Sequence, residues 1–246
     1  PEVVSSMKSM DAEISSPDSS TRSITPDAKP SPAEILDKDT YEVWNAALEG
    51  TSLNLHNYIL PKLLDTVNPD HVFFQFTGVR RYTFSKSVYT DMDAIINDPD
   101  AWKSRYKNYY YLDYEHMKKF FHWLTPVVID KYRKNVTDEQ KRLNDVYKTF
   151  VATDIFRDQY LSLATRSKYI LKNHSHTFIA PNRKLDWSSE HFSTEMESVV
   201  GEPIVKPYEV LDNIEDFVID DGNHLNRSGA QKYCDLIYKP YLPDGA

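Results

Sequence analysis

The chain has 246 residues, 40% of them hydrophobic, which suits one α/β domain. Its formal net charge of −8 argues against non-specific binding of nucleic acid, because such binding requires a basic surface. No stretch reaches the roughly 18 apolar residues of a membrane span. We therefore expect a soluble protein without a nucleic-acid or membrane partner. The sequence leaves its compartment open, because it has no visible signal peptide and begins with Pro1 rather than Met, as an incomplete N-terminus would.

The single cysteine, Cys234, excludes an internal disulfide and a Cys-rich zinc site. It lies in an apolar-periodic C-terminal stretch, which predicts a buried thiol that fills space. His174 and His176 alternate before a predicted strand, but no third ligand is evident. We therefore expect neither a metal nor a cofactor.

Residues 1–35 are rich in serine and proline and have little apolar periodicity, so alone they predict a flexible tail. Residues 41–48 form a short β-prone run that ends at the turn-forming Gly50. Ser52 is a suitable N-cap for a helix that Pro61 is expected to interrupt.

Residues 71–77 are almost continuously apolar and of strand length, as in an interior strand that is covered on both faces. Residues 78–113 are polar, Tyr-rich and irregular, as in an inserted lid. Helices are predicted over about 114–134 and 137–172. Together these segments predict a Tyr-rich, largely helical insertion around 78–172.

The C-terminal third continues the alternation of strands and helices. A strand at 177–181 is followed by a helix that starts at Ser188 or Ser189 and ends at Gly201, by short extended pieces at 204–205 and 217–219, and by a last helix over about 228–238. Such alternation predicts parallel strands with helices on both faces. Ligands of such sheets bind beyond the carboxyl ends of the strands.

Asp221 and His224 lie three residues apart in a loop with Gly222, which permits a tight turn. A carboxylate at this spacing can orient the imidazole and stabilise its charged form, as for a general base beside a hydroxyl nucleophile. Alternatively, the carboxylate is a solvated loop residue and His224 is an ordinary residue near a helix N-terminus. The two residues alone leave both interpretations open.

The stretch Asp221-Gly222-Asn223-His224-Leu225-Asn226-Arg227-Ser228-Gly229 resembles the last conserved block of SGNH/GDSL-type hydrolases, a D-x-x-H motif shortly before the C-terminal helix. The resemblance implies a flavodoxin-like, three-layer α/β/α fold with a mainly parallel sheet. It also implies that Asp221 and His224 are catalytic. We expect this domain to span 36–246, after the 1–35 segment, which would hold a degenerate first block.

Residues 45–52 look like the second block of the family, in which a glycine donates its backbone N–H to an oxyanion. By that resemblance Gly50 is an oxyanion-hole donor; the alternative is a turn glycine. The first block should carry the nucleophile in a Gly-Asp-Ser sequence, and its only counterpart is Pro17-Asp18-Ser19-Ser20. Ser19 is therefore the predicted nucleophile, although Pro17 replaces the glycine. The alternative is an ordinary loop serine.

Residues 73–81 match the third block in their strand and in Gly78, but they lack its asparagine, and Val79 stands nearest to that position. Gln75, Thr77 or Arg80 are the candidate substitute donors, and Arg80 would supply the strongest, charge-assisted hydrogen bond. Alternatively, Arg80 is a surface charge that follows a strand.

The first functional hypothesis is a serine ester hydrolase of the SGNH type that acts by a Ser-His-Asp mechanism. A carbohydrate O-acetyl ester is the favoured substrate class, because the family often uses such esters and the Tyr-rich insert could grip a sugar. The alternative is a catalytically degenerate SGNH-fold protein with a glycan-binding or structural role, as in tailed phages. Transfer of the acyl group to a second hydroxyl would use the same residues as hydrolysis.

Overall fold

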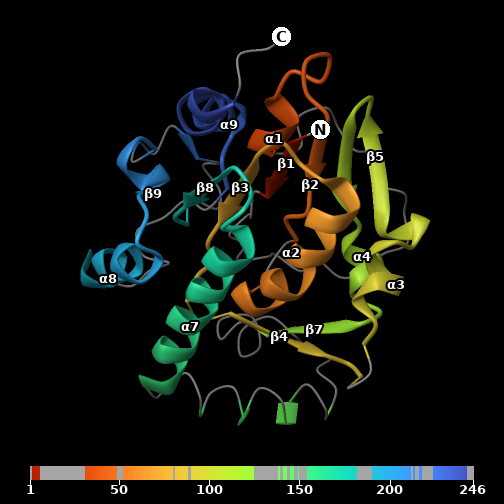
Figure 1. The fold of residues 1–246 in the computed structure, drawn as a ribbon, viewed down its shortest axis with the longest axis vertical. Coiled ribbons are helices and arrows are strands. Elements are labelled where there is room, and N and C mark those ends of the chain that lie inside the picture. Colours follow the sequence, from red (N-terminus) through yellow and green to blue (C-terminus); the bar gives the residue numbers. More distant parts are fainter. Residues whose placement is uncertain are drawn as a thin grey trace.

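The computed structural model describes residues 2–5, 31–48, 52–79, 81–87, 90–124, 154–181, 190–211, 216–217 and 224–242, and a few single positions among 138–149 and at 213. This part of the chain combines helices with a seven-stranded, partly parallel sheet and a two-stranded sheet (Figure 1). The predicted mixed α/β class is therefore confirmed. No helix in the described ranges is long and apolar enough to cross a membrane.

The seven-stranded sheet has the order β5-β6-β2-β1-β3-β8-β9. All neighbouring strands in it are parallel except β5 and β6, which form an antiparallel hairpin. Its strands are β1 (Glu2–Ser5), β2 (Val43–Asn45), β3 (Val72–Gln75), β5 (Trp102–Tyr106), β6 (Tyr109–Leu112), β8 (His176–Ile179) and β9 (Ile204–Val205). The strands predicted at 41–48, 71–77 and 177–181 are thus β2, β3 and β8.

The central strand of this sheet comes from the start of the chain. In β1, Val4 is in register with Asn45 of β2 on one side and with Phe73 of β3 on the other. The composition of residues 1–35 predicted a tail without regular structure. Glu2–Ser5 nevertheless forms a strand, because two neighbouring strands supply partners for its backbone, which no local pattern reveals.

Two apolar clusters lie on opposite faces of the sheet. On β3, Val72 and Phe74 belong to one cluster, which includes residues of α2, α7 and α8, whereas Phe73 belongs to the other, which includes residues of α1 and α9. Successive side chains of a strand point to opposite faces, so each face of β3 is covered by helices. This explains why the sequence of β3 is apolar without alternation.

Several helix boundaries agree with those predicted from the sequence. The helices outside the segment between β3 and β7 are α1 (Pro32–Ile35), α2 (Leu53–Val67), α7 (Asp154–Leu171), α8 (Glu190–Val200) and α9 (Arg227–Tyr233). Helix α9 continues as a π-helical turn over Cys234–Tyr238. Ser52 is the N-cap of α2 as predicted, and Gly201 follows α8 with a φ of 68°. The predicted interruption at Pro61 was wrong: α2 continues through it. The packing of α2 against the sheet and α7 outweighs the one backbone hydrogen bond that a proline removes.

The segment after β3 is more regular than predicted. It contains β4 (Tyr82–Ser85), α3 (Met92–Ile96), the β5–β6 hairpin, α4 (Tyr114–Met117) and β7 (Phe121–Leu124). The irregular structure expected over 78–113 was therefore wrong, whereas the helix expected over about 114–134 begins at Tyr114 as predicted but ends at Met117, before β7. Asn108, with a φ of 58°, forms the hairpin turn. Strands β4 and β7 form the two-stranded sheet, which lies below α2 in Figure 1.

Candidate functional site

The carboxyl ends of the central parallel strands define the candidate site. The chain passes from β1 to β2 on one side and then returns to β3 on the other side of β1. Ligands of open parallel sheets bind where the strand order reverses in this way, beyond the carboxyl ends. The strand ends at this point are Ser5 of β1, Asn45 of β2 and Gln75 of β3.

Three of the seven predicted site residues lie in the described part of the chain: Thr77, Gly78 and His224. Thr77 and Gly78 follow the carboxyl end of β3, and His224 precedes α9. The other four lie outside the described residues: Ser19, Gly50, Arg80 and Asp221. The contact between Ser19 and His224, on which the predicted mechanism depends, therefore remains a prediction.

His224 is held in a buried loop, with 4% of its surface exposed. The next residue, Leu225, forms a β-bridge with Phe217 and packs in the same cluster as Phe73 of β3 and Ile179, the last residue of β8. His224 therefore directly precedes a residue that packs in the same apolar cluster as β3 and β8.

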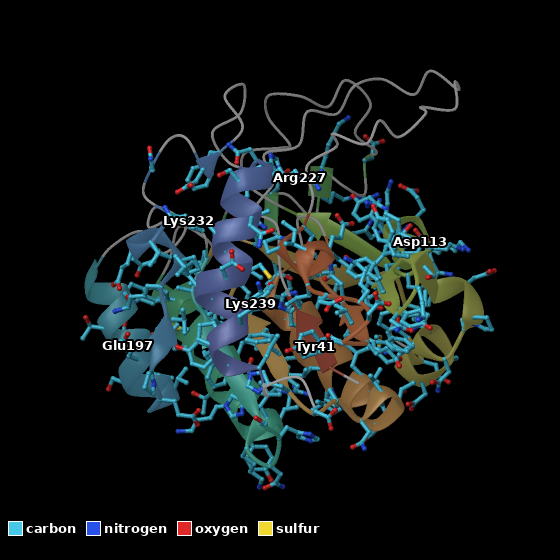
Figure 2. All side chains as sticks on the ribbon, turned by 90° about the horizontal axis from the view of Figure 1, so that it is seen from above. Tyr41, Asp113, Glu197, Arg227, Lys232 and Lys239 are labelled. Atoms are coloured by element: carbon cyan, nitrogen blue, oxygen red, sulfur yellow. The ribbon has the colours of Figure 1, made fainter. Side chains whose placement is uncertain are left out.

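The start of α9 is anchored by Asn226 and Asp216. The Oδ1 atom of Asn226 accepts a hydrogen bond from the backbone N–H of Gly229 at 2.8 Å, and its Nδ2 atom donates to the Phe217 carbonyl at 3.1 Å. Lys232 pairs with Asp216 at 2.9 Å. Figure 2, in which the molecule is viewed from above, labels Arg227 and Lys232 on this helix. The residues just after His224 are therefore fixed by an N-cap and by a partly buried ion pair.

The loop after β3 is held by its own hydrogen bonds. The Thr77 hydroxyl donates to the Gly78 carbonyl at 3.2 Å, and the Thr77 carbonyl accepts a hydrogen bond from the Tyr160 hydroxyl of α7 at 2.6 Å. Gln75 is 1% exposed and donates to the Ala180 carbonyl after β8 at 3.1 Å. Two of the predicted oxyanion donors, Gln75 and Thr77, thus have structural partners in this conformation.

A further set of buried polar residues lies around the start of α2, and the sequence patterns did not single it out. Ser52 is 0% exposed, and its hydroxyl lies 2.7 Å from that of Thr83 on β4. Asn54 exchanges hydrogen bonds with the backbone of Thr83. The predicted N-cap role of Ser52 is correct in position, but its hydroxyl makes no bond to the helix backbone. The local sequence has no signal for this arrangement, because its partner lies about 30 positions away.

Asn45 supports the same edge of the sheet. It is 7% exposed and donates to the Tyr109 hydroxyl of β6 at 2.9 Å, while its Oδ1 atom accepts the Ala47 N–H at 3.0 Å. Burial raises the pKa of Tyr109, so its hydroxyl stays protonated. Asn45 therefore sets the direction in which the chain leaves β2 at Ala46 and Ala47.

The buried imidazole of His56 packs on the Phe74 ring of β3. It lies in the first part of α2, is buried, and meets the Phe74 ring edge to face with centroids 5.8 Å apart. Burial lowers its pKa to about 3, and the positive charge of Arg81 acts in the same direction. At neutral pH, His56 therefore adds no positive charge to the site.

In the described ranges, no group of three or more His, Cys, Asp or Glu side chains is placed to hold a metal ion. Comparison of the chain with protein-family models, with curated proteins and with solved structures finds no match. The relation to SGNH hydrolases therefore stays a prediction from the sequence motif.

Proposed function

We propose that the protein is a serine ester hydrolase of the SGNH type with a flavodoxin-like, three-layer α/β/α domain. The observation that carries this proposal is the position of His224. It is buried just before α9, and its neighbour Leu225 belongs to the same apolar cluster as Phe73 of β3 and Ile179 of β8. The parallel order β2-β1-β3-β8-β9 and the helices on both faces of β3 agree with such a fold.

In the proposed mechanism, a serine hydroxyl attacks the ester carbonyl, His224 accepts its proton, and Asp221 orients the imidazole. The backbone N–H of Gly50 stabilises the developing oxyanion, and Gly78 or Arg80 supplies a second donor. The ester C–O bond then breaks, and His224 returns the proton to the leaving alcohol. Water, deprotonated by His224, hydrolyses the acyl-serine and frees the acid and the serine hydroxyl. A carbohydrate O-acetyl ester stays the proposed substrate class, and transfer of the acyl group to a second hydroxyl would use the same residues.

The nucleophile has two candidates. Ser19 follows the Asp18 of the degenerate Gly-Asp-Ser block. Ser6, however, comes directly after β1, and β1 is the strand at which the order of the sheet reverses. A nucleophile placed directly after the central strand would lie at the expected ligand site, which makes Ser6 the rival of Ser19.

A second candidate function is a glycan-binding or structural protein that retains the fold without catalysis. One observation favours it: the Thr77 hydroxyl, a predicted substitute for the missing asparagine, donates to the Gly78 carbonyl. The loss of one oxyanion donor slows acyl transfer by roughly a hundredfold or more.

Hydrolysis of p-nitrophenyl acetate and labelling by a fluorophosphonate test the proposal. We expect the wild type to be active and labelled, and His224→Ala to lose both properties. Ser6→Ala and Ser19→Ala identify the nucleophile, since only one of them should abolish labelling. A wild type without turnover or labelling would overturn the enzymatic proposal in favour of the second candidate.

A further inference from the structure

Asn226 joins the segment Asp216–Phe217 to the first turn of α9. Its Nδ2 atom donates a hydrogen bond to the Phe217 carbonyl at 3.1 Å, and its Oδ1 atom accepts one from the backbone N–H of Gly229 at 2.8 Å. Its own backbone N–H donates to the Asp216 carbonyl at 3.0 Å. One residue thus holds together two segments that are separated by the loop with His224.

The same pairing extends to Leu225, the residue between His224 and Asn226. Leu225 forms an antiparallel β-bridge with Phe217, is 6% exposed, and packs in the apolar cluster that includes Phe73 of β3. The backbone that follows His224 is therefore fixed by polar contacts on one side and by apolar packing on another. His224 itself is 4% exposed. A buried ring has few orientations open to it, so its position follows that of its backbone.

The segment to which Asn226 is bonded is itself fixed to α9. Asp216 is 6% exposed, and its carboxylate lies 2.9 Å from Nζ of Lys232. Gly229 lies against the Asp216 backbone and leaves no room there for a Cβ atom. Asp216–Phe217 therefore forms a firm support, and the hydrogen bonds of Asn226 transmit its position to the residues next to His224.

We infer that Asn226 is a positioning residue for the imidazole of His224: by bonding to Phe217, it fixes where the backbone beside that ring lies. This inference rests on the proposed function, in which His224 is the general base. A general base must lie within hydrogen-bond reach of the hydroxyl that it deprotonates. A misplacement of about 1 Å can cost about a hundredfold in rate.

Substitutions can separate the two side-chain contacts of Asn226. Asn226→Ala removes both the cap of α9 and the hydrogen bond to the Phe217 carbonyl. Asn226→Ser keeps a good N-cap residue but has no amide donor for that carbonyl, so it tests the contact with Phe217 alone. If capping were the only role of Asn226, the serine variant would behave like the wild type.

Asp91 provides a matched control. It is the N-cap of α3, and its side chain accepts hydrogen bonds from the N–H groups of Asp93 at 3.0 Å and of Ala94 at 3.1 Å. Helix α3 packs in a different apolar cluster from Leu225. Asp91→Ala therefore removes the cap of another short helix and none of the contacts of Asn226. Both Asn226→Ala and Asp91→Ala should lower the thermal midpoint of unfolding.

The experiment measures kcat and KM for p-nitrophenyl acetate and the NMR resonance of the imidazole Cε1–H group of His224, which is identified by its loss in His224→Gln. We expect Asn226→Ala and Asn226→Ser to lower kcat about tenfold or more while KM changes by less than about twofold. Both variants should also shift the His224 resonance. Asp91→Ala should keep kcat within about twofold of the wild type and leave that resonance in place.

Unchanged kcat or an unmoved His224 resonance in Asn226→Ser would overturn this inference alone. Equal losses of kcat in Asn226→Ala and Asp91→Ala would also overturn it, since they would indicate a general effect of stability. If Asn226→Ala does not fold, Asn226→Ser decides the matter by the same two readouts. A wild type without turnover or fluorophosphonate labelling would overturn the proposed function and this inference together.

Discussion

Gly229 at the start of α9 lies against the backbone of Asp216, so closely that a Cβ atom at position 229 would come within 2.0 Å of the Asp216 carbonyl oxygen. Any side chain at position 229 must push α9 away from the backbone of Asp216. The glycine that ends the Asp221–Gly229 motif therefore has a packing reason: it lets α9 lie directly against the backbone of Asp216.

Gly229→Ala tests this close approach. We expect the free energy of unfolding to fall by about 1–3 kcal/mol, because the added methyl group overpacks a rigid backbone contact. Urea denaturation measures the change. Ser228→Ala is the control, because Ser228 is the exposed neighbour in the same turn, and it should stay within about 0.5 kcal/mol of the wild type. Equal stability of Gly229→Ala and the wild type would contradict the described packing.

Tyr160→Phe tests the support of the loop after β3. The change removes the hydrogen bond to the Thr77 carbonyl, and we expect a loss of about 1–3 kcal/mol in stability, because a buried acceptor loses a partner. Tyr169→Phe on the same helix is the matched control, since Tyr169 is 67% exposed. A loss of similar size in both variants would show that the Thr77 contact has no special weight.

Two buried histidines predict a loss of stability in acid. Burial, with a smaller effect from His176, lowers the pKa of His71 to about 4, and burial lowers that of His56 to about 3, against 6.5 for an unperturbed histidine. Below pH 6.5 these two side chains therefore bind more protons in the unfolded chain than in the folded one. Stability contributed by the neutral rings is present above pH 6.5 and falls as the pH drops toward 4, by up to about 1.4 kcal/mol per pH unit and group.

Urea unfolding of the wild type and His71→Gln between pH 7 and 4 measures this effect. The wild type should lose stability more steeply than His71→Gln below pH 6.5, since glutamine binds no proton in this range. Parallel curves for the wild type and His71→Gln would refute a depressed pKa at His71.

Cys234 should be unreactive in the folded protein. It is 0% exposed, as its place in the apolar C-terminal stretch predicted, and burial raises its pKa to about 11, so little thiolate forms at mildly alkaline pH. We expect no reaction with Ellman's reagent in buffer and stoichiometric reaction in concentrated guanidinium chloride. Rapid reaction of the folded protein would mean that the helix end opens readily.

Local patterns were sufficient for the elements whose neighbours along the chain determine their environment. The continuous apolar run around Phe73 and Phe74 predicted an interior strand, and Ser52 and Gly201 correctly marked one helix start and one helix end. The hairpin around Asn108 was missed, although a short turn between aromatic runs is a signal for it. Pro61 was given too much weight, because a proline stops a helix only where packing does not compensate.

The candidate site, too, was predictable from local sequence only in part. The motif around His224 placed this residue before the last helix, and the structure adds its burial and its anchoring by Asn226. The contact of Asn54 with Thr83 had no signal, because it joins residues 29 positions apart. The choice between Ser6 and Ser19 as nucleophile arose only when Glu2–Ser5 was found in the centre of the sheet.

By itself, then, the amino-acid sequence determined the α/β class, the interior strands and the position of the histidine loop, since apolar periodicity and turn residues act over a few neighbours. Only the tertiary structure decided that four residues near the chain start complete the sheet and that α2 and β4 are joined by a buried polar pair. Backbone partners and buried hydrogen bonds between distant segments exist only once the chain has folded, so no window of sequence contains them.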